Sequence, residues 1–274
     1  MRLDVVLPNT GDYALEAVRA APVFEDMGFE GMWLTDHVLG MEGYTTYGDY
    51  WLEILTTLSH IAGRTKTIRL GTGVLIAPLR DSVLTAKMLS TIDVLSGGRL
   101  DLGIGTGWLK REFNALGRAG LYEGRGAATD EAMDVYLTCW KGGEFSHQGR
   151  WSNSSKIRFD PVPVQTPHPP FWIGARGLQP APMRRAAKYA DYWHPTGLSP
   201  EAVREGGERL DALAGRKVPR TIRIRPPADA SEARDLIGGY EDAGCVAAAL
   251  DFSGGAATYA EFLARAEALI KVMA

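Results

Sequence analysis

The sequence predicts an α/β fold, and specifically a single-domain (β/α)8 TIM barrel spanning residues 1–274. Short apolar runs alternate with helical patterns from one end of the 274-residue chain to the other. Eight strand candidates with helices between them fit this barrel, whose usual size is about 250 residues. A doubly wound open sheet would normally show a glycine fingerprint directly after its first strand, and residues 7–11 (LPNTG) do not carry one.

The apolar runs themselves are the strand candidates. They cover residues 3–8, 32–35, 68–75, 100–103, 171–173, 192–194, 221–225 and 246–252. The segments between them place apolar residues on one helix face, as Leu84, Met88 and Ile92 do. Pro22 falls inside the first helical pattern and predicts a kink or a late start there. Residues 141–170 are too long for an ordinary connection, so we expect an irregular excursion with two short antiparallel strands before the fifth barrel strand.

Composition and charge exclude several classes of protein. Hydrophobic residues make up 45% of the chain and charged residues 23%, which is typical of a globular protein. The net charge of −3 provides no field that attracts nucleic acid or an anionic membrane, and no apolar run approaches the roughly 20 residues that span a bilayer. Cys139 and Cys245 show no disulfide or zinc-ligand pattern, and the N-terminus shows no signal peptide. We therefore expect a cytoplasmic protein with free thiols and no metal site.

The active site of such a barrel lies at the carboxyl ends of its strands. The second strand ends in Asp36 and His37, which place a titratable imidazole beside a carboxylate, and these two are the candidate catalytic residues. The alternative is an aspartate that caps the following loop, with the histidine packed beneath it. Because adjacent strand residues point to opposite faces, only one of the pair can face the barrel axis unless the strand has already ended.

Glycine-rich segments follow the third, fourth and fifth strands. Glycine permits tight turns, and it also lets backbone N–H groups approach a flat or anionic ligand, so we expect a large ligand on this side of the mouth. The residues that could contact such a ligand are Thr72, Gly73, Val74, Gly105, Thr106, Gly107, Gly174, Ala175, Arg176 and Gly177, and the family resemblance described below implies that the ligand is a cofactor. Residues 174–177 precede a helix and could present amides and one guanidinium to a phosphate, but residues 253–255 (SGG) compete for that role.

Aromatic side chains near the strand ends are the candidates for the substrate pocket. We assign Trp51, Trp108 and His194 to it. The alternative for each is a place in the core, where aromatic side chains at strand ends and helix faces often pack. The sequence does not identify the substrate itself.

Several segments together resemble a known family. They are GFEGMWLTDH at 28–37, IRLGTGV at 68–74, DVLSGGRL at 93–100, GIGTGW at 103–108 and RRAAKYADYWHP at 184–195. In this order and spacing, the segments resemble the luciferase-like monooxygenase superfamily, and within it the coenzyme F420-dependent oxidoreductase branch. The resemblance covers nearly the whole chain.

The resemblance implies a barrel whose mouth holds an isoalloxazine-type ring against a bulge in the third strand. It further implies a non-proline cis peptide at Gly73–Val74 and a cofactor phosphate at residues 174–177. By the same likeness, His37 together with Asp36 lies near the reactive face of the ring.

One departure from the family bears on the substrate. Members that oxidise sugar phosphates place a glutamate and a tryptophan where this sequence has Trp108 and Met41. This difference argues against the same substrate. It also leaves His37 as the obvious proton-transfer group.

The function implied is hydride transfer between the deazaflavin coenzyme F420 and an unidentified organic small molecule, with His37 as general acid or base. The alternative is an FMN-dependent monooxygenase that uses reduced flavin and oxygen and relies on a separate reductase. A cofactor-free or metal-assisted hydrolase or lyase working through Asp36 and His37, and a flavin-binding protein without catalysis, are further alternatives. Family members are often homodimers, so we expect a homodimer with no nucleic-acid or membrane partner.

Overall fold

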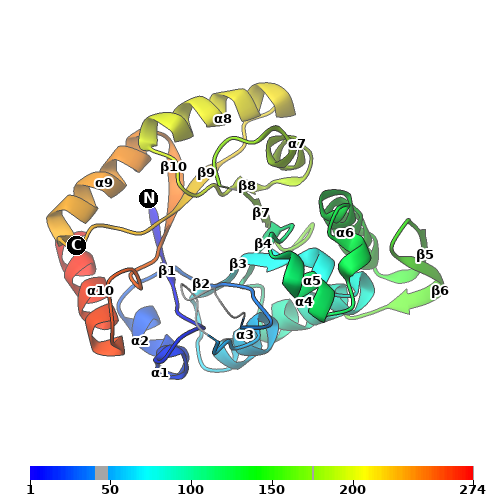
Figure 1. Cartoon of the computed structure of the whole chain (residues 1–274), viewed down its shortest axis with the longest axis horizontal. Coiled ribbons are helices and arrows are strands. Elements are labelled where there is room, and N and C mark those ends of the chain that lie inside the picture. The colour runs from blue at the N-terminus through cyan, green and yellow to red at the C-terminus, as the bar shows by residue number, and fades with distance from the viewer. Residues whose placement is uncertain (41–48, 175, 274) are drawn as a thin grey trace.

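Eight parallel strands close into a barrel, which confirms the predicted fold class. The computed structural model describes residues 1–40, 49–174 and 176–273. Within these residues the strand order around the barrel is β1-β10-β9-β8-β7-β4-β3-β2, with parallel pairing between neighbours (Figure 1). The barrel strands are β1 (Arg2–Val6), β2 (Gly31–Leu34), β3 (Arg69–Ile76), β4 (Leu100–Gly105), β7 (Phe171–Ile173), β8 (Tyr192–Trp193), β9 (Arg220–Ile224) and β10 (Cys245–Leu250).

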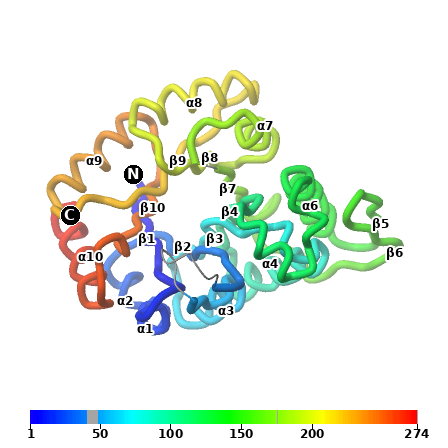
Figure 2. Tube along the Cα trace, in the orientation of Figure 1, coloured from blue at the N-terminus to red at the C-terminus, as the bar shows by residue number. Residues whose placement is uncertain are grey.

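Helices cover the outside of the barrel (Figure 2). They are α1 (Ala14–Arg19), α2 (Ala21–Asp26), α3 (Ile54–Ala62), α4 (Ser82–Ser96), α5 (Lys110–Ala115), α6 (Arg125–Cys139), α7 (Pro180–Tyr189), α8 (Pro200–Ala214), α9 (Ala230–Asp242) and α10 (Tyr259–Met273), with short 3-10 helices at Ala77–Leu79 and Ala119–Leu121. The first helical pattern divides at Ala20, and α2 then begins with Pro22 in its first turn. This is the interruption that the proline predicts, because its ring disfavours a helix interior but suits a first turn.

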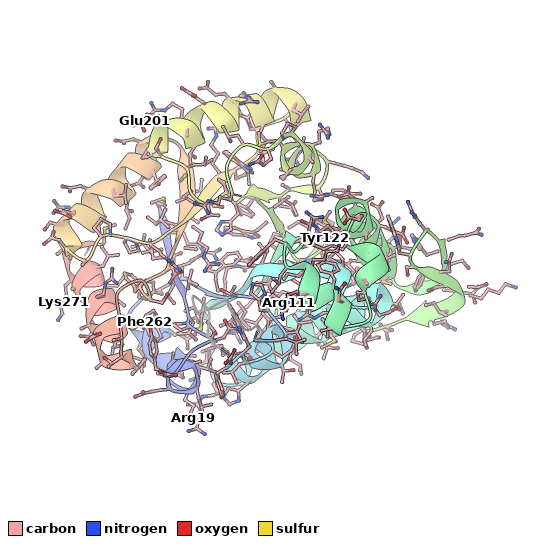
Figure 3. The ribbon with its side chains drawn as sticks, in the orientation of Figure 1. Arg19, Arg111, Tyr122, Glu201, Phe262 and Lys271 are labelled. Carbon is pink, nitrogen blue, oxygen red and sulfur yellow. The ribbon has the colours of Figure 1, made fainter. Side chains whose placement is uncertain are left out.

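The largest apolar core lies between the barrel and the helices. Phe262 of α10 is fully buried in this core. Arg19, Glu201 and Lys271 instead lie on the outer side of the helical ring (Figure 3). The helices therefore present one apolar face to the barrel and a charged face to solvent, as amphipathic helices do.

Trp33 of β2 occupies the interior of the barrel. Its ring centroid is 4.7 Å from that of Trp172 and 5.0 Å from that of His194, on which it stacks. The indole Nε1 donates a 2.8 Å hydrogen bond to Asp4. A Cβ atom at Gly71 would lie 2.3 Å from Cδ2 of Trp33, so the indole fits only because residue 71 has no side chain.

Four charged side chains close the amino-terminal end of the barrel, and we call them the lower charge cluster: Arg2, Asp4, Arg69 and Asp101. Arg2 donates to Asp4 at 2.7 and 2.8 Å and to Asp101 at 2.7 Å. Arg69 donates to Asp101 at 2.5 and 2.9 Å. The two carboxylates are buried, and each is paired with at least one guanidinium, as buried charges must be.

An excursion precedes the fifth barrel strand, as predicted. Strands β5 (Gly143–Gln148) and β6 (Asn153–Phe159) form a two-stranded antiparallel sheet outside the barrel. The hairpin lies beyond α6, at the edge of the molecule (Figure 1). Glu131 of α6 accepts hydrogen bonds from the backbone N–H groups of Arg150, Trp151 and Ser152, which ties the hairpin turn to that helix.

Cys139 and Cys245 are both buried free thiols. Burial raises the pKa of the Cys139 thiol to about 11 and that of Cys245 to about 12, so both stay protonated near neutral pH. Within residues 1–40, 49–174 and 176–273, no helix is long and apolar enough to cross a bilayer. The same residues contain no group of three His, Cys, Asp or Glu side chains placed to hold a metal ion.

Candidate active site at the barrel mouth

The third barrel strand carries a bulge at its carboxyl end. The register of β3 against β4 shifts between Thr72 and Leu75, and the Gly73–Val74 peptide bond is cis. A Cβ atom at Gly105 would lie 2.4 Å from Cγ2 of Val74, so the bulge packs onto a strand that needs glycine there. The bulge and the cis peptide implied by the family resemblance are therefore both present.

Arg223 of β9 holds this bulge from across the mouth. Its Nη1 donates a 2.6 Å hydrogen bond to the carbonyl oxygen of Gly73. Its Nη2 lies 3.4 Å from the hydroxyl oxygen of Thr35 and 3.3 Å from a carboxylate oxygen of Asp251. The bulge is thus connected to the opposite side of the barrel by one side chain.

His37 pairs with a carboxylate that the sequence analysis did not single out. Its Nδ1 lies 3.1 Å from Oε2 of Glu112, on the first turn of α5. The other oxygen of Glu112 accepts a 2.6 Å hydrogen bond from the backbone N–H of Val38. Both side chains are buried. The dyad therefore joins the end of β2 to the helix after β4.

The charge of Glu112 determines the tautomer of His37. Burial would raise the pKa of Glu112, but hydrogen bonds from His37 and Val38 outweigh this effect and lower the pKa. A carboxylate only accepts hydrogen bonds, so Nδ1 of His37 carries the proton that is donated in this contact. This arrangement is typical of a general acid or base whose ring is oriented by a carboxylate.

The expected pairing of Asp36 with His37 is wrong. Asp36 accepts hydrogen bonds from Nη1 and Nη2 of Arg80 at 2.6 and 2.8 Å and from the backbone N–H of Ile76 at 2.8 Å. Burial raises the pKa of Asp36, whereas the Arg80 guanidinium opposes that rise. Arg80 also donates to Glu53 at 2.8 Å, at the start of α3. Asp36 therefore anchors the loop around the site, which is the structural alternative stated for it.

Two of the three aromatic candidates flank His37. The ring centroid of Trp51 lies 4.9 Å from that of His37, and the centroid of Trp108 lies 6.1 Å away, both edge-on. Trp108 is 48% exposed, so it forms the outer rim of the site. The structure thus brings His37, Trp51 and Trp108 together, although their contact with a substrate stays a prediction.

His194 occupies a different place, inside the barrel. It stacks on Trp33, and its Nδ1 lies 2.8 Å from the hydroxyl of Thr221, which donates to the carbonyl of Trp193. Burial, with Arg223 and Arg2 nearby, lowers the pKa of His194 to about 3. His194 is therefore a neutral ring in the barrel interior, and a contact with substrate stays a prediction.

Residues 174–177 form the loop proposed for the cofactor phosphate, and Ala175 lies outside the described residues. A Cβ atom at Gly174 would lie 1.6 Å from the carbonyl oxygen of His194, so this glycine is required for the approach of the two strands. Gly177 has φ of +75° and donates to the carbonyl of Thr196 at 3.3 Å. Arg176 is exposed and is the charged group that this loop offers to an anion.

The helix after this loop offers fewer amides than expected. Helix α7 begins at Pro180, and Pro182 follows in the same turn. Proline has no N–H, and the amide of Met183 already donates to the carbonyl of Gln179. The expectation that several α7 amides face a phosphate is therefore corrected, because the first turn supplies only the N–H of Ala181.

The segment after β4 is the third glycine-rich candidate. Gly107 has φ of +72°, and a Cβ atom there would lie 2.7 Å from Ile76. Its carbonyl accepts a 3.0 Å hydrogen bond from Arg125 and lies 3.4 Å from the Thr106 hydroxyl. The turn is thus fixed by packing and hydrogen bonds before any ligand binds, and it directs Trp108 toward His37.

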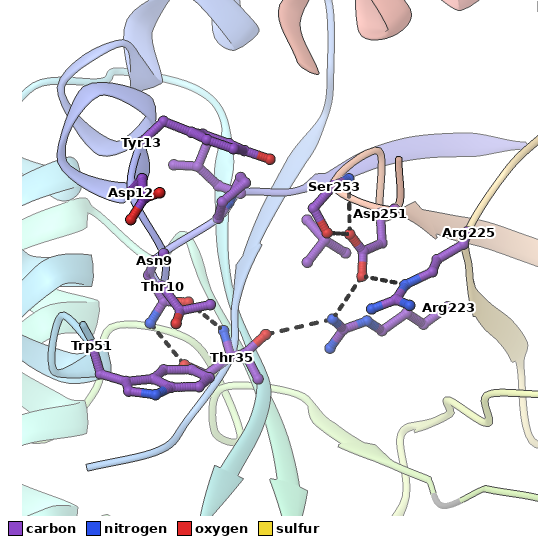
Figure 4. Close-up of a pocket in the computed structure, with 15 residues that line it drawn as sticks. Asn9, Thr10, Asp12, Tyr13, Thr35, Trp51, Arg223, Arg225, Asp251 and Ser253 are labelled. Carbon is purple, nitrogen blue, oxygen red and sulfur yellow. Dashed lines mark hydrogen bonds and ion pairs between the residues drawn. The ribbon is translucent and has the colours of Figure 1, made fainter. Parts of the chain in front are cut away.

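A polar pocket lies on the other side of the mouth, at the ends of β1, β9 and β10. We call it the arginine pocket; it has a volume of about 430 Å³, and its polar and aromatic lining includes Asn9, Thr10, Asp12, Tyr13, Thr35, Trp51, Arg223, Arg225, Asp251 and Ser253 (Figure 4). Trp51 lines this pocket and also contacts His37. Sequence reasoning assigned Trp51 to the substrate pocket and considered residues 253–255 as an alternative phosphate site, but it did not single out Arg223 or Arg225.

Comparison with known proteins is consistent with this architecture. A family model described as luciferase-like monooxygenase matches residues 1–269. The chain is 28% identical to the FMNH(2)-dependent dimethylsulfone monooxygenase of Pseudomonas putida over 72% of its length and 52% of the relative. It is 29% identical to the F420-dependent hydroxymycolic acid dehydrogenase of Mycobacterium tuberculosis over 64% of its length and 47% of the relative. The chain thus spans about half the length of these curated relatives.

A solved structure shares the fold. It is that of an F420-dependent secondary alcohol dehydrogenase in complex with an F420-acetone adduct, with a TM-score of 0.78 and 16% sequence identity. The match covers 91% of this chain and 92% of that one. Relatives of both cofactor types are therefore present, and the family match spans nearly the whole chain. The chain belongs to the luciferase-like monooxygenase family of oxidoreductases.

Proposed function

We propose that this protein transfers a hydride between coenzyme F420 and an organic small molecule. The observation that carries the proposal is the His37–Glu112 dyad, which lies at the same mouth as the Gly73–Val74 bulge. A bound deazaflavin supplies a carbon atom that accepts or donates a hydride. The chain then has to supply binding, orientation and a route for the accompanying proton.

His37 supplies that route. Glu112 holds the Nδ1 proton, so Nε2 of His37 takes up or releases the proton that accompanies hydride transfer. Trp51 and Trp108 flank the imidazole, and His37 is only 7% exposed to solvent. General acid–base catalysis by a positioned side chain contributes typically about 10²- to 10⁴-fold to a rate.

The residues present fit a deazaflavin. The bulge at Gly73 and Val74 would support the ring, and Arg176 would bind the phosphate. Within the described residues, the guanidinium of Arg176 has no hydrogen-bond partner, while α7 offers the single amide of Ala181. Such a sparse donor set matches a phosphodiester with one negative charge better than a phosphate monoester, which carries about −1.5 to −2 at pH 7. This charge argument favours F420, a diester, over FMN, a monoester.

The second candidate is an FMN-dependent monooxygenase. The similarity to the FMNH(2)-dependent enzyme of Pseudomonas putida supports it. In that case, a separate reductase would supply reduced flavin, and His37 would act as proton donor or acceptor in the oxygenation. Both candidates use the same mouth of the barrel.

Parallel equilibrium binding of oxidised F420 and FMN, followed by fluorescence, tests the proposal. We expect F420 to bind more tightly than FMN, and Arg176→Gln to weaken F420 about tenfold or more, since hydrogen bonds to charged groups contribute about 1.5–3 kcal/mol. Arg184→Gln is the matched control, because Arg184 is also exposed but lies on α7. Gly174 is unsuitable as a control position because any side chain there meets the His194 carbonyl.

Each outcome decides between the candidates. Tighter binding of FMN, with oxygen consumption in the presence of reduced FMN, would transfer the assignment to the monooxygenase. Binding of neither cofactor at micromolar concentration would overturn both. If Arg176→Gln and Arg184→Gln lost F420 affinity equally, the proposal that the 174–177 loop binds the cofactor phosphate would be wrong.

A further inference from the structure

We propose that the arginine pocket binds a carboxylate group of the substrate, with Arg225 as the residue that recognises it. The proposal extends the proposed function. It rests on that function in one respect, namely that the molecule bound in the pocket is the substrate. It concerns the side of the mouth formed by β1, β9 and β10, opposite the bulge proposed for the cofactor. A pocket of about 430 Å³ lies within the range of small-molecule sites, about 300–1,000 Å³.

Arg225 is placed and directed by its surroundings. Its stem lies against Gly254, where a Cβ atom would come within 3.2 Å of Cδ of the arginine. Its Nε lies 3.4 Å from Asp251, and within the described residues its two Nη atoms have no hydrogen-bond partner. The side chain is 60% exposed, and Figure 4 shows both guanidinium groups directed into the pocket. Arg225 therefore presents a fork of donors that suits a planar carboxylate.

The charges around Arg225 select the kind of anion. Asp251 accepts from the backbone N–H and hydroxyl of Ser253 at 3.2 and 2.5 Å and lies 3.3 and 3.4 Å from Arg223 and Arg225. Burial would raise the pKa of Asp251, but Arg223 and these hydrogen bonds lower it, so the group is ionised. Two guanidinium groups against one carboxylate leave a single positive charge. This charge matches one carboxylate better than a phosphate dianion.

The opposite wall of the pocket leads to the proton-transfer group. Trp51 lies across the pocket from the two arginines in Figure 4, and its ring is 4.9 Å from that of His37. Asp12 on the same wall is exposed to solvent, so its charge is screened by water. A molecule whose carboxylate pairs with Arg225 therefore extends across Trp51 toward His37. Arg223 borders both regions, since it donates to the carbonyl of Gly73.

The loop that carries Ser253 and Gly254 is held in place before any ligand binds. Arg265 of α10 donates to the carbonyl of Phe252 at 2.9 Å and also to that of Gly254. The hydroxyl of Tyr13 lies 3.3 Å from the carbonyl of Ala256. These contacts hold the loop against which Arg225 packs. Less conformational entropy is therefore lost when a ligand binds.

Calorimetric titration of the full chain with benzoate, benzamide and phenyl phosphate tests the inference. Benzoate offers a carboxylate for Arg225 and a ring for Trp51, while benzamide keeps the shape without the charge. We expect benzoate to bind at least about tenfold more tightly than benzamide, and at least about tenfold more weakly to Arg225→Gln than to the wild type. Arg234→Gln is the matched control, because Arg234 on α9 is 51% exposed and lies outside the pocket lining. It should leave benzoate affinity unchanged.

The titrations are carried out with and without saturating F420, so that the two proposals fail separately. Absence of F420 binding with intact, Arg225-dependent benzoate binding would overturn the proposed function and leave the carboxylate site standing. Equal benzoate affinity in wild type and Arg225→Gln, or no benzoate binding at millimolar concentration, would overturn the carboxylate site. Tighter binding of phenyl phosphate than of benzoate would show that the pocket selects a dianion instead. Unfolding curves of Arg225→Gln and Arg234→Gln confirm that both variants are folded.

Discussion

The two ends of the barrel hold the same kinds of charged residue in different ways. At the lower end, the Asp4 and Asp101 side chains are each 1% exposed, and their partners Arg2 and Arg69 are 19% and 29% exposed. At the mouth, Asp251 is also buried, and of its two partners Arg223 is 23% exposed and Arg225 is 60% exposed. The lower charge cluster satisfies its own charges, whereas the arginine pocket leaves donors directed at a ligand. The difference separates charges that close the barrel from charges that can recognise a molecule.

This contrast agrees with the general division of labour in such barrels. Residues at the carboxyl ends of the strands carry chemistry, and residues at the amino ends carry stability. Substitutions at the mouth should therefore change binding and turnover, whereas substitutions at the lower end should change the free energy of unfolding. The two kinds of measurement together test the comparison.

The largest effect is expected at His37. His37→Gln should lower kcat by about 10²- to 10⁴-fold, because it removes the group proposed to transfer the proton. The free energy of unfolding should change by less than about 1 kcal/mol, since the glutamine can still donate to Glu112. Initial rates of F420 reduction or reoxidation, together with urea unfolding, measure both quantities. A variant that keeps full turnover would remove His37 from the reaction.

At the lower end, Asp101→Asn should produce a loss of similar size in stability instead. Asp101 balances Arg2 and Arg69, and removal of one partner from a buried ion pair costs about 3–5 kcal/mol. The affinity for F420 should stay within about twofold of the wild type, because Asp101 lies at the opposite end of the barrel. Urea unfolding and cofactor titration are the two measurements. A stable variant with weakened cofactor binding would reverse the proposed division between the two ends.

The fold was predictable because its signal is local and repeated. The apolar run at 171–173 corresponds to β7, since buried parallel strands are apolar on both faces, and the strand predicted at 100–103 corresponds to most of β4 although Asp101 interrupts its apolar pattern. The sequence did not indicate why residue 71 is glycine. The structure gives the reason, because the indole of Trp33 occupies the space that a side chain at residue 71 would need. That contact joins neighbouring strands and depends on register, which periodicity does not specify.

Two parts of the site could be predicted from the sequence. The bulge at Gly73 and Val74 followed from the family resemblance, and the place of His37 at the mouth followed from its position at the end of a strand. The adjacency of Asp36 and His37 suggested a pair, but Asp36 turns to Arg80 and His37 to Glu112. Neither partner follows from spacing, because each depends on how a loop crosses to another element. The contact of Arg223 with Gly73 spans 150 residues of sequence, and only the closed barrel brings the two together.

Asp36 offers a sharper test, because it lies at the mouth but is paired like a residue of the lower end. Asp36→Asn should lower the free energy of unfolding by about 1.5–3 kcal/mol, the range for hydrogen bonds to charged groups. The loss should be smaller than at Asp101, because Asp36 pairs with one guanidinium, that of Arg80, whereas Asp101 pairs with two. The pH profile of kcat should keep its shape, whereas Glu112→Gln should alter it. If Asp36→Asn changed the pH profile of kcat and Glu112→Gln did not, Asp36 rather than Glu112 would be the carboxylate that takes part in catalysis.

The smallest effect concerns His194, which is buried between the two ends. Its pKa of about 3 in the folded protein lies below the ordinary value near 6.5, so the unfolded chain binds more protons between these values. The free energy of unfolding should therefore fall as the pH drops below about 6.5, by at most about 1.4 kcal/mol per pH unit, or roughly 2 kcal/mol by pH 5. His194→Phe keeps a ring to stack on Trp33 but cannot titrate, so its stability should fall less steeply over this range. Equal slopes for the two proteins in urea unfolding at pH 7, 6 and 5 would show that His194 takes up protons equally in the folded and unfolded states, which would contradict its lowered pKa.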